Sequence, residues 1–168
     1  MILETERLIL RRFLPDDAAF ALRLLNEPSF IENIGDRGVR TLDDAVHYLA
    51  EGPGAMYETH GHGLYLVALK QTLQPIGMCG LLKRDAFPDV DVGYAFLPEF
   101  WSKGYARESV IAALGEARAL GLKKVIALVS PGNVASVRLL DKLGFSPAGR
   151  SRMTPGSADE VEVFALVF

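Results

Sequence analysis

A strand and a helix are expected to meet in the segment Leu97-Pro98-Glu99-Phe100-Trp101-Ser102-Lys103-Gly104-Tyr105-Ala106-Arg107-Glu108. Apolar residues alternate with others over residues 90–97, which favours a strand, and they recur at helical spacing over residues 104–120. The turn between them has neither the Gly-x-x-x-x-Gly-Lys-Ser/Thr spacing of a P-loop nor the full Gly-x-Gly-x-x-Gly of dinucleotide folds. ATP and NAD are therefore disfavoured as ligands of this turn.

The turn nevertheless has the features of an anion-binding site. Gly104 and the small Ala106 would let an anion approach the main chain closely. The first amides of a helix have no intrahelical acceptors and lie at the positive end of its dipole. We therefore expect the amides of residues 102–107 to bind a phosphate or pyrophosphate, with Lys103 and Arg107 adding positive charge. A well-packed strand-to-helix turn without a ligand is the alternative that this pattern leaves open.

A second polar pair follows the next expected strand, a continuous apolar run over residues 125–129. Asn133 and Ser136 lie three residues apart at the start of a helix expected over residues 134–143. This spacing is typical of helix capping. It also places both side chains at the carboxyl end of a strand, where ligands bind in such sheets.

Outward from these segments, the chain is expected to form one domain of the α/β (α+β) class over residues 1–168. The order β-α-α-β-β-β-α-β-α-β-β is predicted, with strands at 7–14, 64–70, 76–84, 90–97, 125–129, 145–152 and 161–168, and helices at 17–27, 41–51, 104–120 and 134–143. Residues 26–38 are expected to form a loop. Residues 52–54 are expected to end the second helix and to start a short further one toward Glu58.

The connections predict how the strands pair. Short turns over residues 64–97 predict an antiparallel meander. The crossover from residues 90–97 through a helix to residues 125–129 predicts one parallel pair within a mixed sheet.

Composition narrows the classes of partner. The 168 residues are 49% hydrophobic and 23% charged, which is typical of a globular domain. Lys and Arg number 18 against 21 Asp and Glu, and the net charge of -3 provides no general attraction to nucleic acid. The single Cys79, the lack of a secretory signal and the lack of a membrane-spanning apolar run predict a cytoplasmic protein without a membrane partner.

The two polar segments together resemble motifs of one superfamily. Its pattern Gln/Arg-x-x-Gly-x-Gly/Ala falls on residues 101–106, and its pattern Asn-x-x-Ser…Leu-Gly-Phe falls on Asn133, Ser136 and residues 143–145. The chain therefore resembles the GNAT superfamily of acyl-CoA-dependent N-acetyltransferases, and the order of elements along nearly the whole chain is similar to that fold. Tyr94 after a glycine, with the turn that follows, looks most like the branch that acetylates N-terminal amines of ribosomal proteins, including their alanine acetyltransferases.

The resemblance implies a mostly antiparallel mixed sheet with helices on both faces and splayed central parallel strands. Acetyl-CoA, the acyl donor, would lie in the cleft between those strands. Unpaired backbone groups near residues 94–96 would bond its pantetheine amides, as an added strand does. The resemblance thus implies that acetyl-CoA is bound by Tyr94, Ala95, Phe96, Ser102, Lys103, Gly104, Tyr105, Ala106, Arg107, Asn133 and Ser136.

The same resemblance implies roles in a direct transfer through a ternary complex. Asn133 would bond the pantetheine arm, and Ser136 would lie near the thioester sulfur and help the thiolate leave. Some members carry a Glu five residues before the Asn as general base and a Tyr seven residues after it as general acid. In this chain these two positions are Leu128 and Leu140, so the acid–base pair of those relatives cannot be transferred. Many members of the ribosomal-protein branch also lack the pair. Trp101 likewise replaces the first Gln or Arg of the motif, which should not prevent binding by main-chain groups.

Asp91 is the candidate base nearest the expected cleft, with a surface carboxylate as the alternative interpretation. Glu160 and Glu162 near the last strand are interpreted as solvated. No metal site is expected, because the pair His60 and His62 lacks a third ligand of defined spacing.

Because the sequence offers no strong candidate for the general base, the pKa of the acceptor amine becomes important. An α-amine, with a pKa of about 7.7 to 8.0, is roughly a tenth neutral near pH 7, whereas a lysine side chain at about 10.4 is almost entirely charged. This favours the N-terminal α-amine of a protein or peptide. A small-molecule amine (amino acid, polyamine or aminoglycoside) is the alternative acceptor, and a non-catalytic acyl-CoA sensor is the alternative function.

Acceptor choice is expected to lie in residues 28–40, 52–54 and 153–159, at the edges of the cleft. A monomer and a homodimer are both compatible with the sequence.

Overall fold

The computed structural model describes residues 2–154 and 159–168. The strands are β1 (Ile2–Glu4), β2 (Leu8–Arg12), β3 (Leu64–Leu69), β4 (Pro75–Leu82), β5 (Asp91–Phe96), β6 (Lys124–Val129), β7 (Ser146–Arg152) and β8 (Glu160–Val167). The α-helices are α1 (Ala18–Leu25), α2 (Pro28–Asn33), α3 (Leu42–Leu49), α4 (Ala55–His60), α5 (Tyr105–Ala119) and α6 (Val134–Lys142). Shorter helical turns are η1 (Pro15–Asp17), η2 (Ala50–Gly54) and η3 (Pro98–Phe100). The predicted order of elements is present, including the short helix expected toward Glu58, which is α4, and β1 and α2 are added to it.

One sheet contains the eight strands in the order β1-β2-β3-β4-β5-β6-β8-β7. Every neighbouring pair is antiparallel except β5 and β6, which run parallel. The predicted mixed, mostly antiparallel sheet is therefore confirmed.

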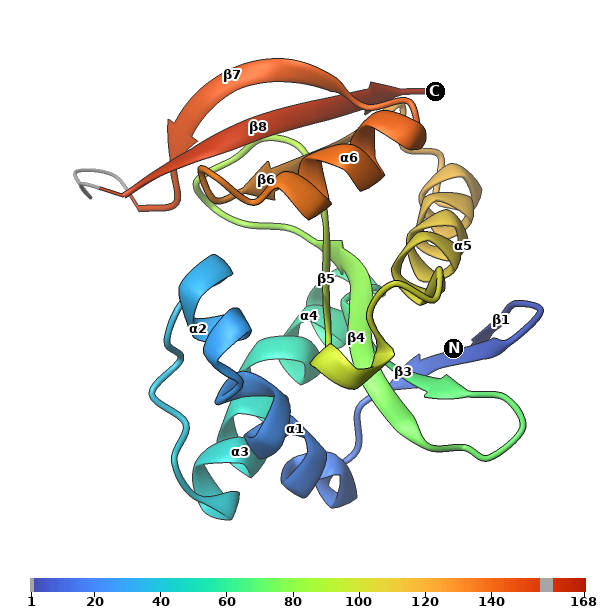
Figure 1. Ribbon diagram of the computed structural model, residues 1–168, viewed down its shortest axis with the longest axis vertical. Helices are drawn as coiled ribbons and strands as arrows, with labels where there is room; N and C mark the ends of the chain where they lie inside the picture. Colours follow the sequence, from blue (N-terminus) through green and yellow to red (C-terminus); the bar gives the residue numbers. More distant parts are fainter. Residues whose placement is uncertain (1, 155–158) are drawn as a thin grey trace.

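Helices cover both faces of this sheet (Figure 1). Because side chains alternate along a strand, β3 contributes to two cores: Tyr65 and Val67 pack in one, and Leu64 and Leu66 pack in the other. The first core receives the apolar stripe of α5, and the second receives α1, α2 and α3. The prediction of helices on both faces is confirmed.

The central parallel strands separate soon after they begin. Within the part of the chain that the structure describes, β5 and β6 share one register pair, Asp91 with Ile126. There the Ile126 amide donates to the carbonyl of Val90 at 3.0 Å. Beyond this pair the carboxyl-terminal ends of β5 and β6 diverge, so the predicted splay is confirmed.

Three segments depart from the predictions. The edge strand β1 was not predicted, since three residues are too few to establish an alternating pattern. The loop predicted over residues 26–38 is wrong in part, because α2 begins at Pro28, where a missing N–H costs no helical hydrogen bond. The second helix ends at Leu49, near the predicted Glu51, and the short helix predicted after it is α4; however, the stretch between them is the π-helical η2, with Pro53 buried, and not a break.

Part of the predicted loop over residues 153–159 lies outside the described residues, namely 155–158. Among the helices that the structure describes, none is long and apolar enough to cross a membrane.

Candidate active site

The turn before α5 presents free main-chain donors. Gly104 is the N-cap residue with a φ of 83°, and Ser102 also has a positive φ of 61°. The first backbone bond of the helix runs from the Glu108 amide to the carbonyl of Gly104, at 3.1 Å. Among residues 2–154 and 159–168, nothing accepts a hydrogen bond from the amides of residues 102–107. Residues 102–104 are exposed, so these donors are accessible to a ligand.

Side chains from the β1–β2 hairpin support this turn. The carboxylate of Glu108 accepts hydrogen bonds from Thr5 Oγ1 at 2.5 Å, from the Arg7 amide at 2.8 Å and from Arg7 Nε at 2.7 Å. Arg7 Nη1 donates to the carbonyl of Lys103 at 2.9 Å, and its guanidinium lies 4.5 Å from the centre of the Tyr105 ring. Burial alone would raise the pKa of Glu108, but the bonds from Thr5 and Arg7 lower it below its ordinary value. An ionised Glu108 therefore holds the turn in place together with Arg7.

Backbone groups of β5 face the gap at the splay. The Leu97 amide donates to β4 at 3.0 Å, so in the antiparallel ladder Ala95 also directs its backbone groups to β4. Tyr94 and Phe96 direct theirs to the opposite side, toward β6. The Phe96 carbonyl accepts a hydrogen bond from Trp101 Nε1 at 2.9 Å. Of the three predicted positions, Tyr94 and Phe96 thus present main-chain groups to the gap, whereas Ala95 pairs with β4.

A pair of hydroxyl groups bridges the gap. Tyr94 Oη of β5 and Ser136 Oγ of α6 lie 2.5 Å apart. Burial raises the pKa of Tyr94 to about 12, so this phenol is protonated near neutral pH and can donate to Ser136. Asn133 Oδ1 accepts from the Ser136 amide at 3.3 Å, which confirms the capping interpretation of this pair. The side chain of Tyr94 was missed, because its partner lies 42 residues away in the sequence.

Asp91 lies away from this bridge. Its side chain is 2% exposed, and its Oδ1 is 3.1 Å from Arg84 Nε. Burial raises the pKa of Asp91, an effect that Arg84 opposes. Asp91 stands where β5 still pairs with β6, three residues or about 10 Å along the strand from Tyr94. The structure therefore does not bring this carboxylate to Ser136.

The other candidates for proton transfer also lie elsewhere. Glu160 and Glu162 are each 3.9 Å from the exposed Arg150, in surface ion pairs. Leu140 is fully buried in the core, and Leu128 packs on the apolar side of β6. No general acid or base is available at those two positions.

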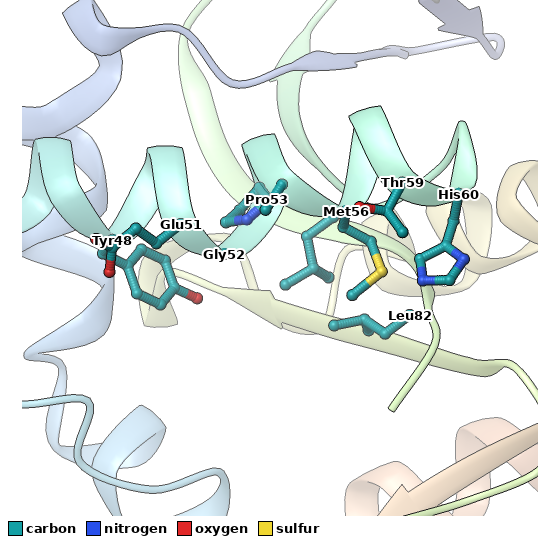
Figure 2. Close-up of a pocket in the computed structure, with 10 residues that line it drawn as sticks. Tyr48, Glu51, Gly52, Pro53, Met56, Thr59, His60 and Leu82 are labelled. Carbon is teal, nitrogen blue, oxygen red and sulfur yellow. The ribbon is translucent and has the colours of Figure 1, made fainter. Parts of the chain in front are cut away.

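Two of the segments predicted to choose the acceptor have defined contacts in the structure. Ser130 Oγ, at the end of β6, donates to the carbonyl of Asn33 and so ties α2 to the splayed region. Of residues 52–54, Gly52 and Pro53 line a cavity of about 230 Å³ beneath the continuous helical stretch α3–η2–α4. Figure 2 shows Met56 projecting from this stretch toward Leu82, and Tyr48 projecting from the same side of it near Glu51.

Comparison with known proteins agrees with this geometry. The acetyltransferase (GNAT) domain family matches residues 7–146. The chain is 29% identical over 173 residues to the uncharacterized N-acetyltransferase YoaA of Bacillus subtilis (strain 168), which covers 99% of this chain and 96% of that protein.

Solved structures show the same fold. An acetyltransferase (GNAT family) from Bacillus anthracis superposes with a TM-score of 0.81 at 22% identity, covering 99% of this chain and 98% of that one. The ribosomal L7/L12 alpha-N-protein acetyltransferase RimL, in complex with coenzyme A, superposes with a TM-score of 0.83 at 15% identity, covering 99% and 98%. The family match spans most of the chain and confirms both the resemblance and the expected acyltransferase activity. The chain belongs to the GNAT family of acetyltransferases.

Proposed function

We propose that this acetyltransferase transfers the acetyl group of acetyl-CoA directly to the N-terminal α-amine of a protein or peptide. The observation that carries the proposal is the run of unpaired amides at residues 102–107 beside a gap bridged by Tyr94 and Ser136. The similar fold of RimL, which is named as an alpha-N-protein acetyltransferase and is bound to coenzyme A, supports the same assignment.

The donor side fits the chemistry of acetyl-CoA. A diphosphate needs several hydrogen-bond donors and positive charge, which the free amides, the N-terminus of α5, Lys103 and Arg107 supply. The backbone N–H and C=O of Tyr94 and the N–H of Phe96 suit the amides of the pantetheine arm. These groups would direct the thioester to the hydroxyl bridge.

When bound, acetyl-CoA supplies the thioester whose carbonyl carbon the neutral amine attacks and whose C–S bond then breaks. Ser136 would donate a hydrogen bond to the departing sulfur, while Tyr94 donates to Ser136. A thiol has an ordinary pKa of about 8.5, so complete proton transfer from a phenol with a pKa of about 12 is unfavourable. The bridge therefore stabilises the developing thiolate by hydrogen bonding, and the proton of the attacking amine passes to water.

Among the described residues, the candidate bases named from the sequence lie away from the hydroxyl bridge, which favours an α-amine acceptor. Asp91 is held by Arg84, and leucines stand at positions 128 and 140. An α-amine needs little assistance, since roughly a tenth of it is neutral near pH 7. Catalysis can then depend largely on placing the amine against the thioester.

The test is the rate of CoA release with three sets of acceptors: peptides with free N-termini, the same peptides with blocked N-termini and an internal lysine, and a panel of amino acids, polyamines and aminoglycosides. We expect turnover with free N-termini and none with the blocked peptides. Turnover confined to small amines would overturn the proposed acceptor.

A further inference from the structure

Trp101 is an exposed aromatic residue in the turn that joins β5 to α5. The residue is 50% exposed, although tryptophan is on average a largely buried residue. Its indole Nε1 donates to the carbonyl of Phe96 at 2.9 Å, and that carbonyl lies on the side of β5 that faces the gap toward β6. The indole therefore lies at the edge of the gap, with its one polar atom bonded and much of its apolar surface open to solvent.

Trp101 stands between the two sets of main-chain groups that suit the acyl donor. Ser102, the first of the free amides at the turn, is the next residue along the chain, so their Cα atoms are about 3.8 Å apart. Phe96, whose N–H faces the gap, is joined to the indole through its carbonyl. A ligand that reaches from the amides of the turn to β5 must therefore pass beside Trp101.

The part of CoA that spans this interval is apolar. A carbon with two methyl groups separates the diphosphate from the first amide of the pantetheine arm, and it cannot use main-chain donors. An aromatic face beside it would remove both apolar surfaces from water. We propose that Trp101 is a donor-binding residue whose exposed indole face packs against this dimethyl segment. The inference rests on the binding of acetyl-CoA in the function proposed above.

The hydrogen bond to Phe96 suits the indole to this role. It fixes the orientation of the ring, so little side-chain freedom remains to be lost when a ligand binds. It also satisfies the Phe96 carbonyl, which then needs no partner from the ligand. The Gln or Arg of the family pattern has no comparable apolar face, so tryptophan at position 101 adds a contact that those residues lack.

The first experiment needs no variant, because Trp101 is the single tryptophan in the sequence. Tryptophan emission is recorded during titration with CoA and with adenosine 3′-phosphate 5′-diphosphate, which carries the diphosphate but no pantetheine arm. Calorimetry under the same conditions establishes saturation by each ligand. We expect CoA to shift the emission maximum to shorter wavelength, since the ring loses water, and the nucleotide to bind without this shift.

Two variants separate a contact with the ligand from support of the turn. We expect the Kd of Trp101→Ala for CoA to rise by about fivefold to twentyfold, and its Kd for the nucleotide by less than about twofold. Trp101→Phe keeps an aromatic face without the N–H, and its Kd for CoA should stay within about threefold of the wild-type value. Phe168→Ala is the matched control, because it removes another partly exposed aromatic ring, which lies against Arg118. Thermal unfolding checks that each variant is folded.

The outcomes distinguish this inference from the proposed function. An equal loss of affinity for CoA and for the nucleotide in Trp101→Ala would show that the ring only supports the turn, and would overturn the inference. An emission maximum that saturating CoA leaves unchanged, or that the nucleotide shifts equally, would also overturn it. These results would leave N-terminal acetylation standing. Failure of the wild-type protein to bind CoA would overturn the proposed function and the inference together.

Discussion

The binding cleft proposed along β5 has a donor half and an acceptor half, which are built from different parts of the chain. The donor half uses main-chain groups: the amides of residues 102–107 and the backbone of Tyr94 and Phe96. The proposed acceptor half lies beneath α3–η2–α4, where a cavity is lined by side chains such as Tyr48 and Met56.

The difference predicts how each half should respond to substitution. A site made of backbone groups tolerates side-chain changes, so Trp101 can replace the Gln or Arg of the motif and instead bond the carbonyl of Phe96. A pocket made of side chains changes with every substitution in it. Donor binding should therefore be disrupted most strongly by changes that block or move the backbone, and acceptor choice by changes of side-chain volume.

The largest expected effect comes from blocking the amides directly. Gly104→Glu adds a negative charge at the turn, at a φ of 83° that disfavours any side chain, and its Cβ would lie 3.2 Å from Arg7 Nη2. We expect acetyl-CoA affinity, measured by calorimetry, to fall by at least about a hundredfold. Gly115→Glu places the same charge in open space on the same helix and should bind normally. Unchanged affinity in folded Gly104→Glu would contradict the donor half of the comparison.

Removing the hydroxyl bridge should affect the chemical step. Ser136→Ala is expected to lower kcat by about tenfold to a hundredfold, because the departing thiolate loses a hydrogen-bond donor, while the KM for acetyl-CoA changes little. Tyr94→Phe should cause a smaller loss. Ser136→Thr keeps a hydroxyl group and is the control. A kcat that is unaffected in Ser136→Ala would remove this residue from the mechanism.

The pH dependence of kcat/KM should follow the protonation of the acceptor amine and not that of a protein side chain. As pH rises, more of the α-amine becomes neutral, so kcat/KM for a peptide should increase about tenfold from pH 7 to a plateau above about pH 9. Tyr94 has a pKa raised to about 12 by burial, so it stays protonated and the plateau should extend to pH 10. A decline between pH 8 and 10 would show that another required proton is lost there, against this assignment.

The smallest expected effect comes from the support behind the phosphate turn. Arg7→Ala removes the side-chain bonds from Nε to Glu108 and from Nη1 to the carbonyl of Lys103, and should weaken acetyl-CoA binding by about threefold to tenfold. The KM for the acceptor peptide should not change. Arg118→Ala, which removes a remote contact with the Phe168 ring, is the control. A change in acceptor KM alone would contradict the separation of the two halves.

Local patterns explain why the donor half could be predicted from the sequence. The helix predicted over residues 104–120 is observed as Tyr105–Ala119, because its apolar stripe and the glycines near its ends mark both boundaries. The strands before and after this helix were recognisable from alternating or continuous apolar residues bounded by turns. The positions of the free amides follow from where that helix begins.

Contacts between distant residues explain what could not be predicted. Arg7 and Glu108 are 101 residues apart, and no local pattern connects them. The cavity beneath α3–η2–α4 depends on η2, whose Gly and Pro residues are typical of a helix end, yet Pro53 is buried and the helical path continues. Asp91 was placed on the correct strand, but only the three-dimensional structure shows its ion pair with Arg84.

A crystal structure of the complex with acetyl-CoA tests the central claim most directly. We predict diphosphate oxygens within hydrogen-bonding distance of the amides of residues 102–107, and the pantetheine arm alongside the backbone of Tyr94 and Phe96. A diphosphate bound away from this turn, or a gap between β5 and β6 filled by the protein's own side chains, would contradict the account.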